Sequence, residues 1–439
     1  MFGHLPSAPR LLTLAMLTLG AAPSWASMGN IGTTYGLMPS DVASAQALSM
    51  FNPKVAATYY NPAYLTRDPR GELTAGILHG EHELRAKSDF RDGDLLQDAP
   101  SQHVLIGMKT NVGSLTTMGH PIYLGFVAGV EKYGKEMLAF DAGTSEQGQF
   151  LEYGRQPLFL NVGAATEVWD GISVGYSARV TLHADASLRA VTDLAGNTKY
   201  ETLTVNAKPS LRSILSANLD WGKAFCEDTS CLVNGLETAI TYRSSSSSKT
   251  SVDANTVIPG TIPTPGLSLS VATLDSYQPE TLALGVHYAT HGWRVAVTLE
   301  QQNWSSLGDD FENDTIRDQA GLKFDDILIP RIGAQYHLNE MISLTTGVSF
   351  EKSPLKSDES LNVNYFDNDR IVIGLGATLR LNNAPFMAYP VQLDVGYQHH
   401  MLKERDFQVT YDRPGMQVNE SVTADGDVHV LSAALTLKF

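Results

Sequence analysis

The sequence predicts an all-β membrane protein, a fourteen-stranded antiparallel transmembrane β-barrel. Three observations support this fold class: apolar and polar residues alternate in segments of about ten residues, short and long connections between these segments take turns, and tryptophans lie at segment ends. A barrel strand needs one lipid-facing side and one lumen-facing side over about 10 residues. Beyond the N-terminal region no apolar run reaches about 18 residues, so no transmembrane helix is available.

Composition excludes one class of partner. The chain has 31 basic and 47 acidic residues, so it lacks the basic surface that a nucleic acid requires. Only 18% of residues are charged and 43% are hydrophobic, averages that suit strands whose apolar residues are dispersed by alternation.

The N-terminal region has the pattern of a secretory signal peptide. Arg10 precedes the apolar run Leu11–Ala22, and Ser24 and Ala26 are small residues at the two positions that a signal peptidase recognises. We therefore expect a signal peptide at residues 1–26, with Ser27 as the first residue of the exported protein.

Residues 27–70 lack strand character. Pro53, Pro62 and Pro69 interrupt any β-ladder, and a short helix is expected near Asp41–Met50. One interpretation is a mobile tail. The other is a segment that packs against the rest of the protein, which the adjacent Tyr59 and Tyr60 favour because their rings gain from burial.

Fourteen alternating segments follow between residues 71 and 439. These segments are Glu72–Arg85, Gln102–Asn111, Ile122–Tyr133, Pro157–Trp169, Ile172–Ala184, Lys208–Trp221, Leu236–Arg243, Glu280–Thr290, Trp293–Asn303, Ile327–Leu338, Ile342–Phe350, Arg370–Leu381, Val391–His400 and Val428–Phe439.

The connections between the segments alternate in length, which assigns the two ends of the barrel. Tight turns such as Asp170-Gly171 alternate with long links such as Ser244–Pro279. Within that link, Ser244–Ser248 and Val257–Ser268 have the composition of flexible loop. Short turns face the periplasm and long loops face the exterior in outer-membrane barrels. Four tryptophans lie at segment ends, where a barrel would meet the membrane–water interfaces that tryptophan favours: Trp169, Trp221, Trp293 and Trp304.

Cys226 and Cys231 are the only cysteines, and both lie in a connection at the predicted periplasmic end. Because exported proteins meet an oxidising compartment, we expect them to form a disulfide. Two thiols without an adjacent histidine make a poor metal site.

Alternation places several charged residues on the lumen side, among them Arg179, Arg294, Arg331 and Glu300. One hypothesis is capture of a carboxylate or an ion path. The other is a network of salt bridges that holds a plug, because an unpaired charge in a packed lumen is costly.

Other polar clusters give no site for a metal or a cofactor. The acidic run Asp309–Asp314 and the pair His399-His400 lack the spacing of an EF-hand loop, and Gly374-x-Gly376 lacks the third glycine of a dinucleotide motif. No H-E-x-x-H motif of a zinc protease occurs. We therefore expect no cofactor, no metal and no catalytic residue.

Several motifs resemble the FadL/TodX (OMPP1) family of outer-membrane transporters for hydrophobic compounds. The residues Tyr60, Asn61, Pro62 and Ala63 look like the Y-N-P-A hatch motif of that family. Further along the chain, Pro279–Val286, Gln302–Ser305 and Pro330–Gly333 are similar to family motifs in the same order. The terminal Phe439 resembles the sorting signal of bacterial outer-membrane proteins.

The resemblance implies a barrel (71–439) that holds an N-terminal hatch, or plug (27–70), in its lumen. It implies a monomer in the Gram-negative outer membrane, inserted by the barrel-assembly machinery and surrounded by lipopolysaccharide. Its ligands are long-chain fatty acids, alkanes or aromatic hydrocarbons, taken up passively and released sideways through a kink in the third strand. Gly125 and Gly129 lie in that strand, where glycine permits a bend. The alternatives are a general diffusion porin and a barrel enzyme such as a phospholipase.

Overall fold

The computed structural model describes residues 31–89, 100–113, 119–132, 158–192, 198–226, 231–258, 262–308, 323–356, 367–382, 387–413 and 416–439. The signal peptide predicted at residues 1–26 lies outside these ranges. Among the described residues no helix is both long enough and apolar enough to cross a membrane.

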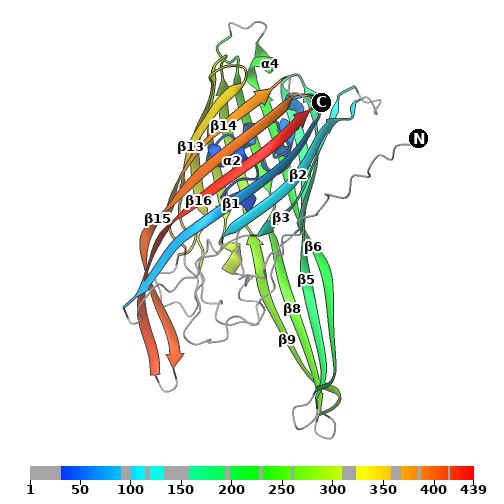
Figure 1. Ribbon diagram of the computed structural model, residues 1–439, viewed down its shortest axis with the longest axis vertical. Coiled ribbons are helices and arrows are strands. Elements are labelled where there is room, and N and C mark those ends of the chain that lie inside the picture. The colour runs from blue at the N-terminus through cyan, green and yellow to red at the C-terminus, as the bar shows by residue number, and fades with distance from the viewer. Residues whose placement is uncertain are drawn as a thin grey trace, which may run out of the picture.

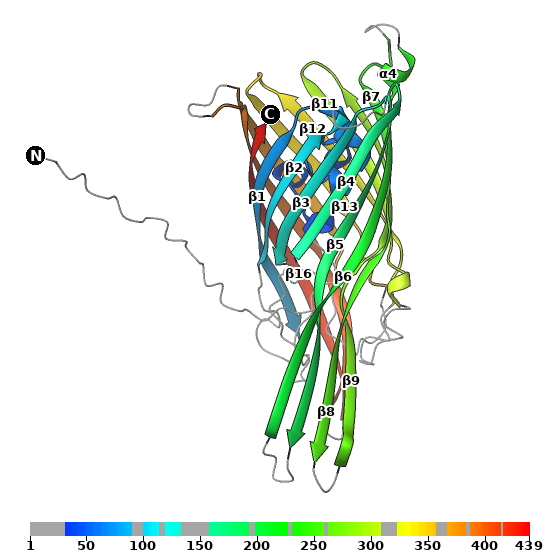
Figure 2. The same cartoon turned by 90° about the vertical axis from the view of Figure 1, so that its right-hand side faces the viewer.

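Within the described part of the chain, fourteen strands close into an antiparallel barrel (Figures 1 and 2). The barrel strands are β1 (Glu72–Ser88), β2 (Ser101–Asn111), β3 (Ile122–Lys132), β4 (Leu158–Trp169), β5 (Ile172–Thr192), β6 (Thr198–Asp220), β7 (Leu236–Arg243), β10 (Glu280–Ala289), β11 (Trp293–Asn303), β12 (Ile327–His337), β13 (Ile342–Glu351), β14 (Arg370–Leu381), β15 (Val391–Arg413) and β16 (Met416–Lys438). Pairing of β1 with β16 and of β4 with β5 completes the ring. The predicted fold class is confirmed.

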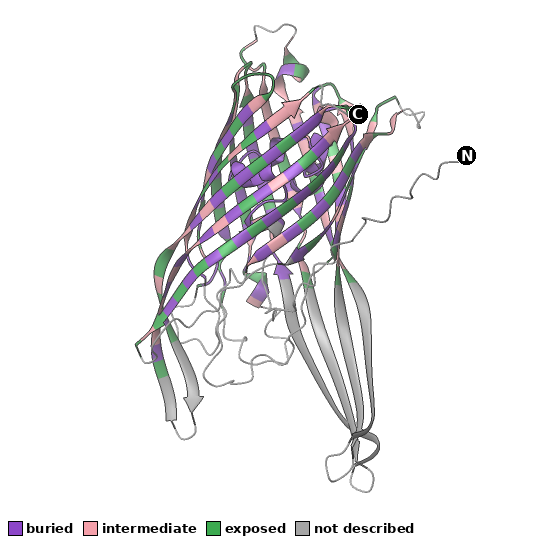
Figure 3. Cartoon of the chain, in the orientation of Figure 1, coloured by how far each residue is buried: buried purple, intermediate pink, exposed green. Residues whose placement is uncertain are grey.

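Alternation along the strands separates a lipid-facing side from a lumen-facing side. In β1, buried and exposed residues alternate without a break from Glu72 to Lys87. Figure 3 shows the same banding around the barrel. The exposed positions carry large apolar side chains such as Ile77 and Val104, which are 59% and 58% exposed and suit contact with lipid.

Residues Ile31–Arg67, called the hatch segment below, lie inside the ring of strands (Figure 2). Its helices are α1 (Ile31–Thr34), α2 (Pro39–Ala43), η1 (Ser49–Phe51), α3 (Ala57–Tyr60) and η2 (Pro62–Arg67). Helix α2 packs against β13 to β16, and η2 packs against β3 to β6 on the other side of the barrel. The hatch segment therefore reaches across the lumen.

The helix expected near Asp41–Met50 is split into α2 and η1. Ala45 and Gln46 between them have φ angles of 46° and 63°, in the left-handed region that costs energy for residues other than glycine. The Gln46 amide donates hydrogen bonds to the Thr33 and Thr34 carbonyls, at 2.9 and 3.0 Å, and these bonds hold the turn.

The prediction of flexible loop at Ser244–Ser248 and Val257–Ser268 is wrong for most of the residues there that the structure describes. The structure forms two strands there, β8 (Ser246–Ile258) and β9 (Ile262–Gln278), with β8 parallel to β5. Serine and proline in this stretch are typical of loops. In the structure, hydrogen bonds to neighbouring strands satisfy the backbone N–H and C=O groups of this stretch instead. Strands β5, β6, β15 and β16 also run further from the membrane than the alternation indicated.

Candidate functional site

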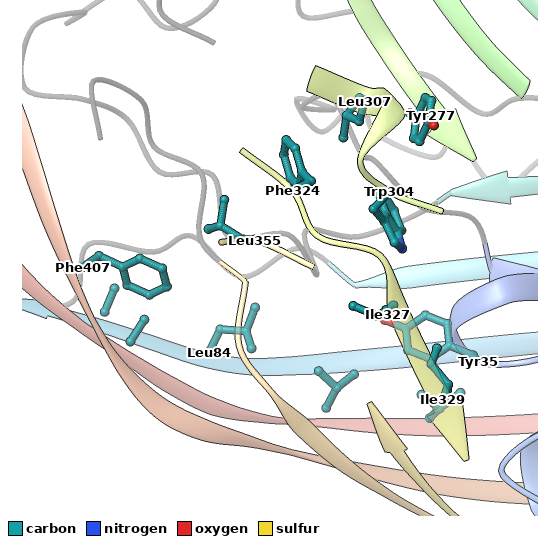
Figure 4. Packing of buried hydrophobic residues seen from close by; sticks show 14 of the residues in the cluster. Tyr35, Leu84, Tyr277, Trp304, Leu307, Phe324, Ile327, Ile329, Leu355 and Phe407 are labelled. Carbon is teal, nitrogen blue, oxygen red and sulfur yellow. The ribbon is translucent and has the colours of Figure 1, made fainter. Parts of the chain in front are cut away.

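A cluster of buried apolar side chains packs inside the barrel, and Figure 4 shows most of its members from close by. The members of this outer apolar cluster are Tyr35, Val42, Leu78, Leu84, Ala86, Tyr277, Trp304, Leu307, Phe324, Ile327, Ile329, Leu355, Phe407, Val422, Ala424, Val428 and Val430. They come from the hatch segment, from β1, β9, β12, β15 and β16, and from the chain that follows β11 and β13 and precedes β12. A barrel lumen is usually polar, so an apolar cluster of this size marks a candidate binding site.

The chain beyond β11 turns inward to cover this cluster. Trp304 is 6% exposed, and its ring packs 5.8 Å from the ring of Tyr277. Phe324 and Leu355 form a bridge between two connecting segments at the barrel mouth. The prediction that Trp304 lies at the lipid interface is wrong, because the residue follows the strand end and folds into the lumen. Trp169 and Trp293 are exposed, at 71% and 44%.

The polar atoms at the outer apolar cluster already have partners. Trp304 Nε1 donates to Gln302 Oε1 at 2.8 Å, and Tyr277 and Ser306 share a hydrogen bond of 2.5 Å. The Tyr35 hydroxyl lies 2.9 Å from His82 Nε2. The site therefore offers contact area rather than hydrogen bonds.

The four residues of the hatch motif are buried and fix the hatch segment to itself and to the wall. The Tyr60 hydroxyl donates to the Gly32 carbonyl at 2.6 Å, and Asn61 Nδ2 donates to the Met50 carbonyl at 2.8 Å. The Ala63 amide donates to Ser216 Oγ of β6 at 2.8 Å.

Glycines of the wall make room for the backbone of the hatch segment, and the sequence analysis did not identify this role. Gly333, Gly347 and Gly374, the glycine row, are register neighbours on β12, β13 and β14. A Cβ at Gly374 would lie 2.5 Å from the Val42 carbonyl oxygen, and one at Gly347 would meet the Ser44 carbonyl. Side chains at these positions would exclude the hatch segment.

Glu300 and Arg331 join one network on the lumen side. Glu300 Oε2 lies 2.5 Å from Arg243 and 3.5 Å from Arg331. Arg331 also lies 3.8 Å from Glu351, which pairs with Arg370 at 2.8 Å. The residues that carry this network, apart from Arg370, are almost fully buried, so the mutual pairing compensates for lost hydration.

Arg179 and Arg294 lie elsewhere in the lumen. Arg179 pairs with Glu131 at 2.8 Å, and its guanidinium carbon lies 4.2 Å from the Phe159 ring centroid. Arg294 donates to the Phe51 carbonyl of the hatch segment at 3.0 Å. The four predicted lumen charges thus occupy three places and form no single site.

Ion pairs tie the hatch segment and its link to the barrel wall, and alternation could not reveal these partners. Lys54 lies 2.6 Å from Asp394, and Arg67 contacts Asp220 and Glu237 at 2.8 and 3.0 Å.

Asp68, just before β1, lies 2.6 Å from Lys438. Burial opposes ionisation of Asp68, but hydrogen bonds from Arg70 and Lys438 outweigh it and hold the pKa of this carboxyl below its usual range.

The comparisons agree with this architecture. A model of the family described as outer membrane protein transport protein (OMPP1/FadL/TodX) matches residues 40–439. The chain is 57% identical over 439 residues to alkane uptake protein A of Marinobacter nauticus, a match that covers 98% of this chain and 96% of that protein.

The chain belongs to the OMPP1/FadL/TodX family.

Solved structures share the fold at low sequence identity. A FadL homologue of Pseudomonas aeruginosa aligns with a TM-score of 0.61 at 12% identity, covering 91% of this chain and 98% of that one. The P. putida toluene transporter TodX aligns with a TM-score of 0.54 at 11% identity, covering 92% and 99%. The resemblance stated from the motifs is confirmed, and the protein is an outer-membrane β-barrel of a Gram-negative bacterium that takes up hydrophobic compounds.

The kink expected in the third strand, β3, as a sideways exit for the ligand is not visible in the structure. Strand β3 pairs with β2 and β4 over nearly its whole length without a register shift. Gly125 makes room for Thr58 and Leu65 of the hatch segment, and Gly129 lies against the Phe159 ring. In this family member both glycines therefore serve close packing, and a sideways exit would require β3 to separate from a neighbour.

At the C-terminus, the Phe439 amide donates to the Gly71 carbonyl at 2.9 Å, and its ring lies 6.1 Å from that of Tyr389. The terminal aromatic thus closes the seam next to the start of β1. Among the described residues no group of three or more His, Cys, Asp or Glu side chains could hold a metal ion.

Cys226 and Cys231 are joined by a disulfide beside α4 (Trp221–Phe225), at the same end of the barrel as the C-terminus (Figure 1).

We predict that replacing both cysteines with serine lowers stability only slightly, by about 2 kcal/mol or less, because the closed loop is short. Thermal unfolding in detergent measures the loss. The bridge itself is checked by intact mass with and without reduction before alkylation, and two freely alkylated thiols in non-reduced exported protein would contradict it.

Proposed function

We propose that this protein takes up alkanes passively, binding them at the outer apolar cluster. The cluster itself carries the proposal, since it gathers buried apolar side chains near the barrel mouth into one continuous group. Each buried methylene gains about 0.8 kcal/mol on leaving water, so a chain of methylenes binds there without polar contacts. The 57% identical relative, named an alkane uptake protein, supports the same substrate class.

The chemistry of the cluster favours a hydrocarbon over a fatty acid. The hydrogen-bonding groups of Trp304, Tyr277 and Tyr35 bind neighbouring side chains, and this arrangement favours a ligand without a carboxylate. A buried carboxylate without a partner is costly. An alkane has no such group.

The hatch segment packs against strands on both sides of the lumen, and this position supports the hypothesis of sideways release over a direct path to the periplasm. Lys54–Asp394, Arg67–Glu237 and Asp68–Lys438 tie this stretch to the wall. On the β3 side the hatch segment meets apolar residues of the wall, among them Leu105, Val127 and Phe159. Release there requires local separation of β3, and no energy source is needed when the ligand moves down its gradient. A general diffusion porin would require a water-filled path, which the buried hatch segment disfavours.

The test replaces apolar side chains at the mouth without altering a barrel strand. Phe324→Gln with Leu355→Gln should lower uptake of radiolabelled hexadecane at least about tenfold, because two buried apolar side chains together contribute more than about 1.4 kcal/mol. Cells that lack their own transporter are used, with surface expression matched. Leu232→Gln is the matched control, since Leu232 is 95% exposed and remote from the cluster. Unchanged uptake in the double variant would overturn the proposed binding site.

A further inference from the structure

The barrel wall lacks a strand partner on one side of β6. Strand β6 pairs with β7 from Ile214 to Asp220, and the Ser244 amide donates to the Ser213 carbonyl at 2.9 Å. Outward of Ser213, β6 pairs only with β5 among the described residues, because β7 ends at Arg243 and β8 pairs with β9 and β5 instead. Figure 2 shows these four strands, β5, β6, β8 and β9, continuing beyond the barrel. Since a barrel wall is closed by bonds between neighbouring strands, this edge of β6 is a break in the wall.

A cavity of about 340 Å³, called the side cavity below, lies at this break. It is partly open and is lined by Ser210 and Leu211 of β6, by Ser245–Ser247 and by Tyr277 of β9. Leu211 is 59% exposed on the outer side, whereas Tyr277 is 2% exposed and its ring packs against Trp304 (Figure 4). The side cavity therefore touches the outer surface of the barrel on one side and the outer apolar cluster on the other.

The side cavity lies at a height where the wall still carries lipid-facing side chains. In the register of β5 and β6, Leu211 pairs with Val180, and Pro209 at the cavity pairs with Leu182. Leu182 is 40% exposed on the same outer side as Leu211. Large apolar side chains on the outer side of a barrel strand indicate contact with lipid. The side cavity is thus within reach of molecules dissolved in the outer leaflet.

Arg212 fixes the edge of the break that lies nearer the periplasm. Its Nε donates to the Ser244 carbonyl at 2.8 Å, its Nη1 to Gln278 Oε1 at 2.6 Å and its Nη2 to the Pro279 carbonyl at 2.7 Å. These acceptors lie just after β7, at the end of β9 and just before β10. One buried guanidinium therefore joins β6 to the segments on the other side of the break, and the side cavity begins outward of it.

The lining of the side cavity suits a passage better than a binding site. A passage must admit a molecule without retaining it, so its binding has to be weak. Serine side chains are short, so Ser210 and Ser245–Ser247 leave space without adding much apolar contact. The outer apolar cluster beyond Tyr277 supplies that contact, and a hydrocarbon gains free energy by moving on to it.

We propose that the side cavity is a lateral inlet through which hydrocarbon dissolved in the outer-leaflet lipid reaches the outer apolar cluster. The inference rests on the proposed function, because it takes this cluster as the binding site. The inlet is distinct from sideways release at β3, where the wall is paired on both sides. A hydrocarbon that enters from lipid does not have to return to water, which is the unfavourable step for an apolar molecule.

The test follows entry by the fluorescence of Trp304. Purified protein in phospholipid vesicles is mixed with bromododecane, which dissolves in the bilayer and quenches tryptophan on contact. The variant Trp304→Phe identifies the part of the signal that comes from Trp304. The side cavity is filled by labelling the variant Ser247→Cys with benzyl methanethiosulfonate, because Ser247 lies opposite Tyr277 in the register of β8 and β9. The introduced thiol is the only free one, since Cys226 and Cys231 form a disulfide.

Ser421→Cys with the same label is the matched control. Ser421 lies on β16, outside the side cavity, where it forms an exposed hydrogen bond of 3.2 Å with Gln408. A second variant, Ser210→Phe, fills the side cavity from β6 without a label. It tests the inlet independently if Ser247→Cys does not fold or does not react.

We expect quenching of Trp304 by bromododecane to become at least about tenfold slower in labelled Ser247→Cys and in Ser210→Phe, since about 1.4 kcal/mol of added barrier is sufficient. The final extent of quenching should stay the same, because the outer apolar cluster is intact. The labelled control should match the native protein in both rate and extent.

An unchanged rate in both filled proteins would overturn the inlet and leave binding at the outer apolar cluster in place. A lower final extent at an unchanged rate would make the side cavity part of the binding site, and this result would also overturn the inlet. If bromododecane never quenches Trp304 in the native protein, the cluster does not bind hydrocarbon, and the proposed function fails together with the inlet.

Discussion

Replacing Gly347 and Gly374 with alanine is expected to displace the hatch segment and make the barrel conduct small ions. A Cβ at Gly374 would lie 2.5 Å from the Val42 carbonyl oxygen, and a Cβ at Gly347 would meet the backbone of Ser44. Backbone cannot move aside as a flexible side chain can, so α2 must leave the wall. Single-channel conductance in planar bilayers measures the effect, and the variant should show open events that the wild type lacks.

Gly76→Ala is the matched control, because it also adds a methyl group on the lumen side of a strand. There the nearest atom, Ala434 Cβ, lies 3.4 Å away, which is ordinary contact. The control should insert and remain closed. If the double variant also remains closed, α2 does not block the pore.

Glu300→Ala is expected to destabilise the barrel by about 3–5 kcal/mol, because it leaves Arg243 and Arg331 buried without their shared carboxylate. Glu300→Gln should cost less, since the amide oxygen still accepts one hydrogen bond. The measurement is unfolding by urea, followed by the shift between folded and unfolded bands on gels run without boiling.

Glu280→Ala is the comparison for this second prediction. Glu280 lies near the rim of a neighbouring strand, where its main partner is the Tyr242 hydroxyl at 2.8 Å. A partly exposed hydrogen bond of this kind contributes about 1 kcal/mol. Equal losses for Glu280→Ala and Glu300→Ala would show that burial of the network adds nothing.

Strands that contact lipid on one side could be predicted closely from the sequence. The ranges expected for Leu236–Arg243, Trp293–Asn303 and Arg370–Leu381 coincide with β7, β11 and β14. The reason is that each residue of such a strand faces either lipid or the lumen. Apolar residues therefore alternate with polar or small residues along the sequence.

Other features were not predictable, because they depend on residues far apart in the chain. Lys54 and Asp394 are separated by 340 residues, and nothing near either residue indicates the other. Likewise, a glycine such as Gly347 has no side chain whose character could show that α2 lies against it. The strands β8 and β9 were missed because their serines and prolines have the composition of a loop.

The seam between β1 and β16 has a consequence for how the chain is assembled. It pairs seventeen residues of the first barrel strand, Glu72–Ser88, with β16, the last barrel strand in chain order. The ring therefore cannot close before β16 has been synthesised, and a chain that ends before β16 keeps two unpaired strand edges. Such a chain also lacks Lys438, so Asp68 loses a partner at the same time. Strand β16 therefore both closes the ring and supplies an ion pair that fixes the link between the hatch segment and β1. A chain without β16 would have an open barrel wall and a less firmly held hatch segment.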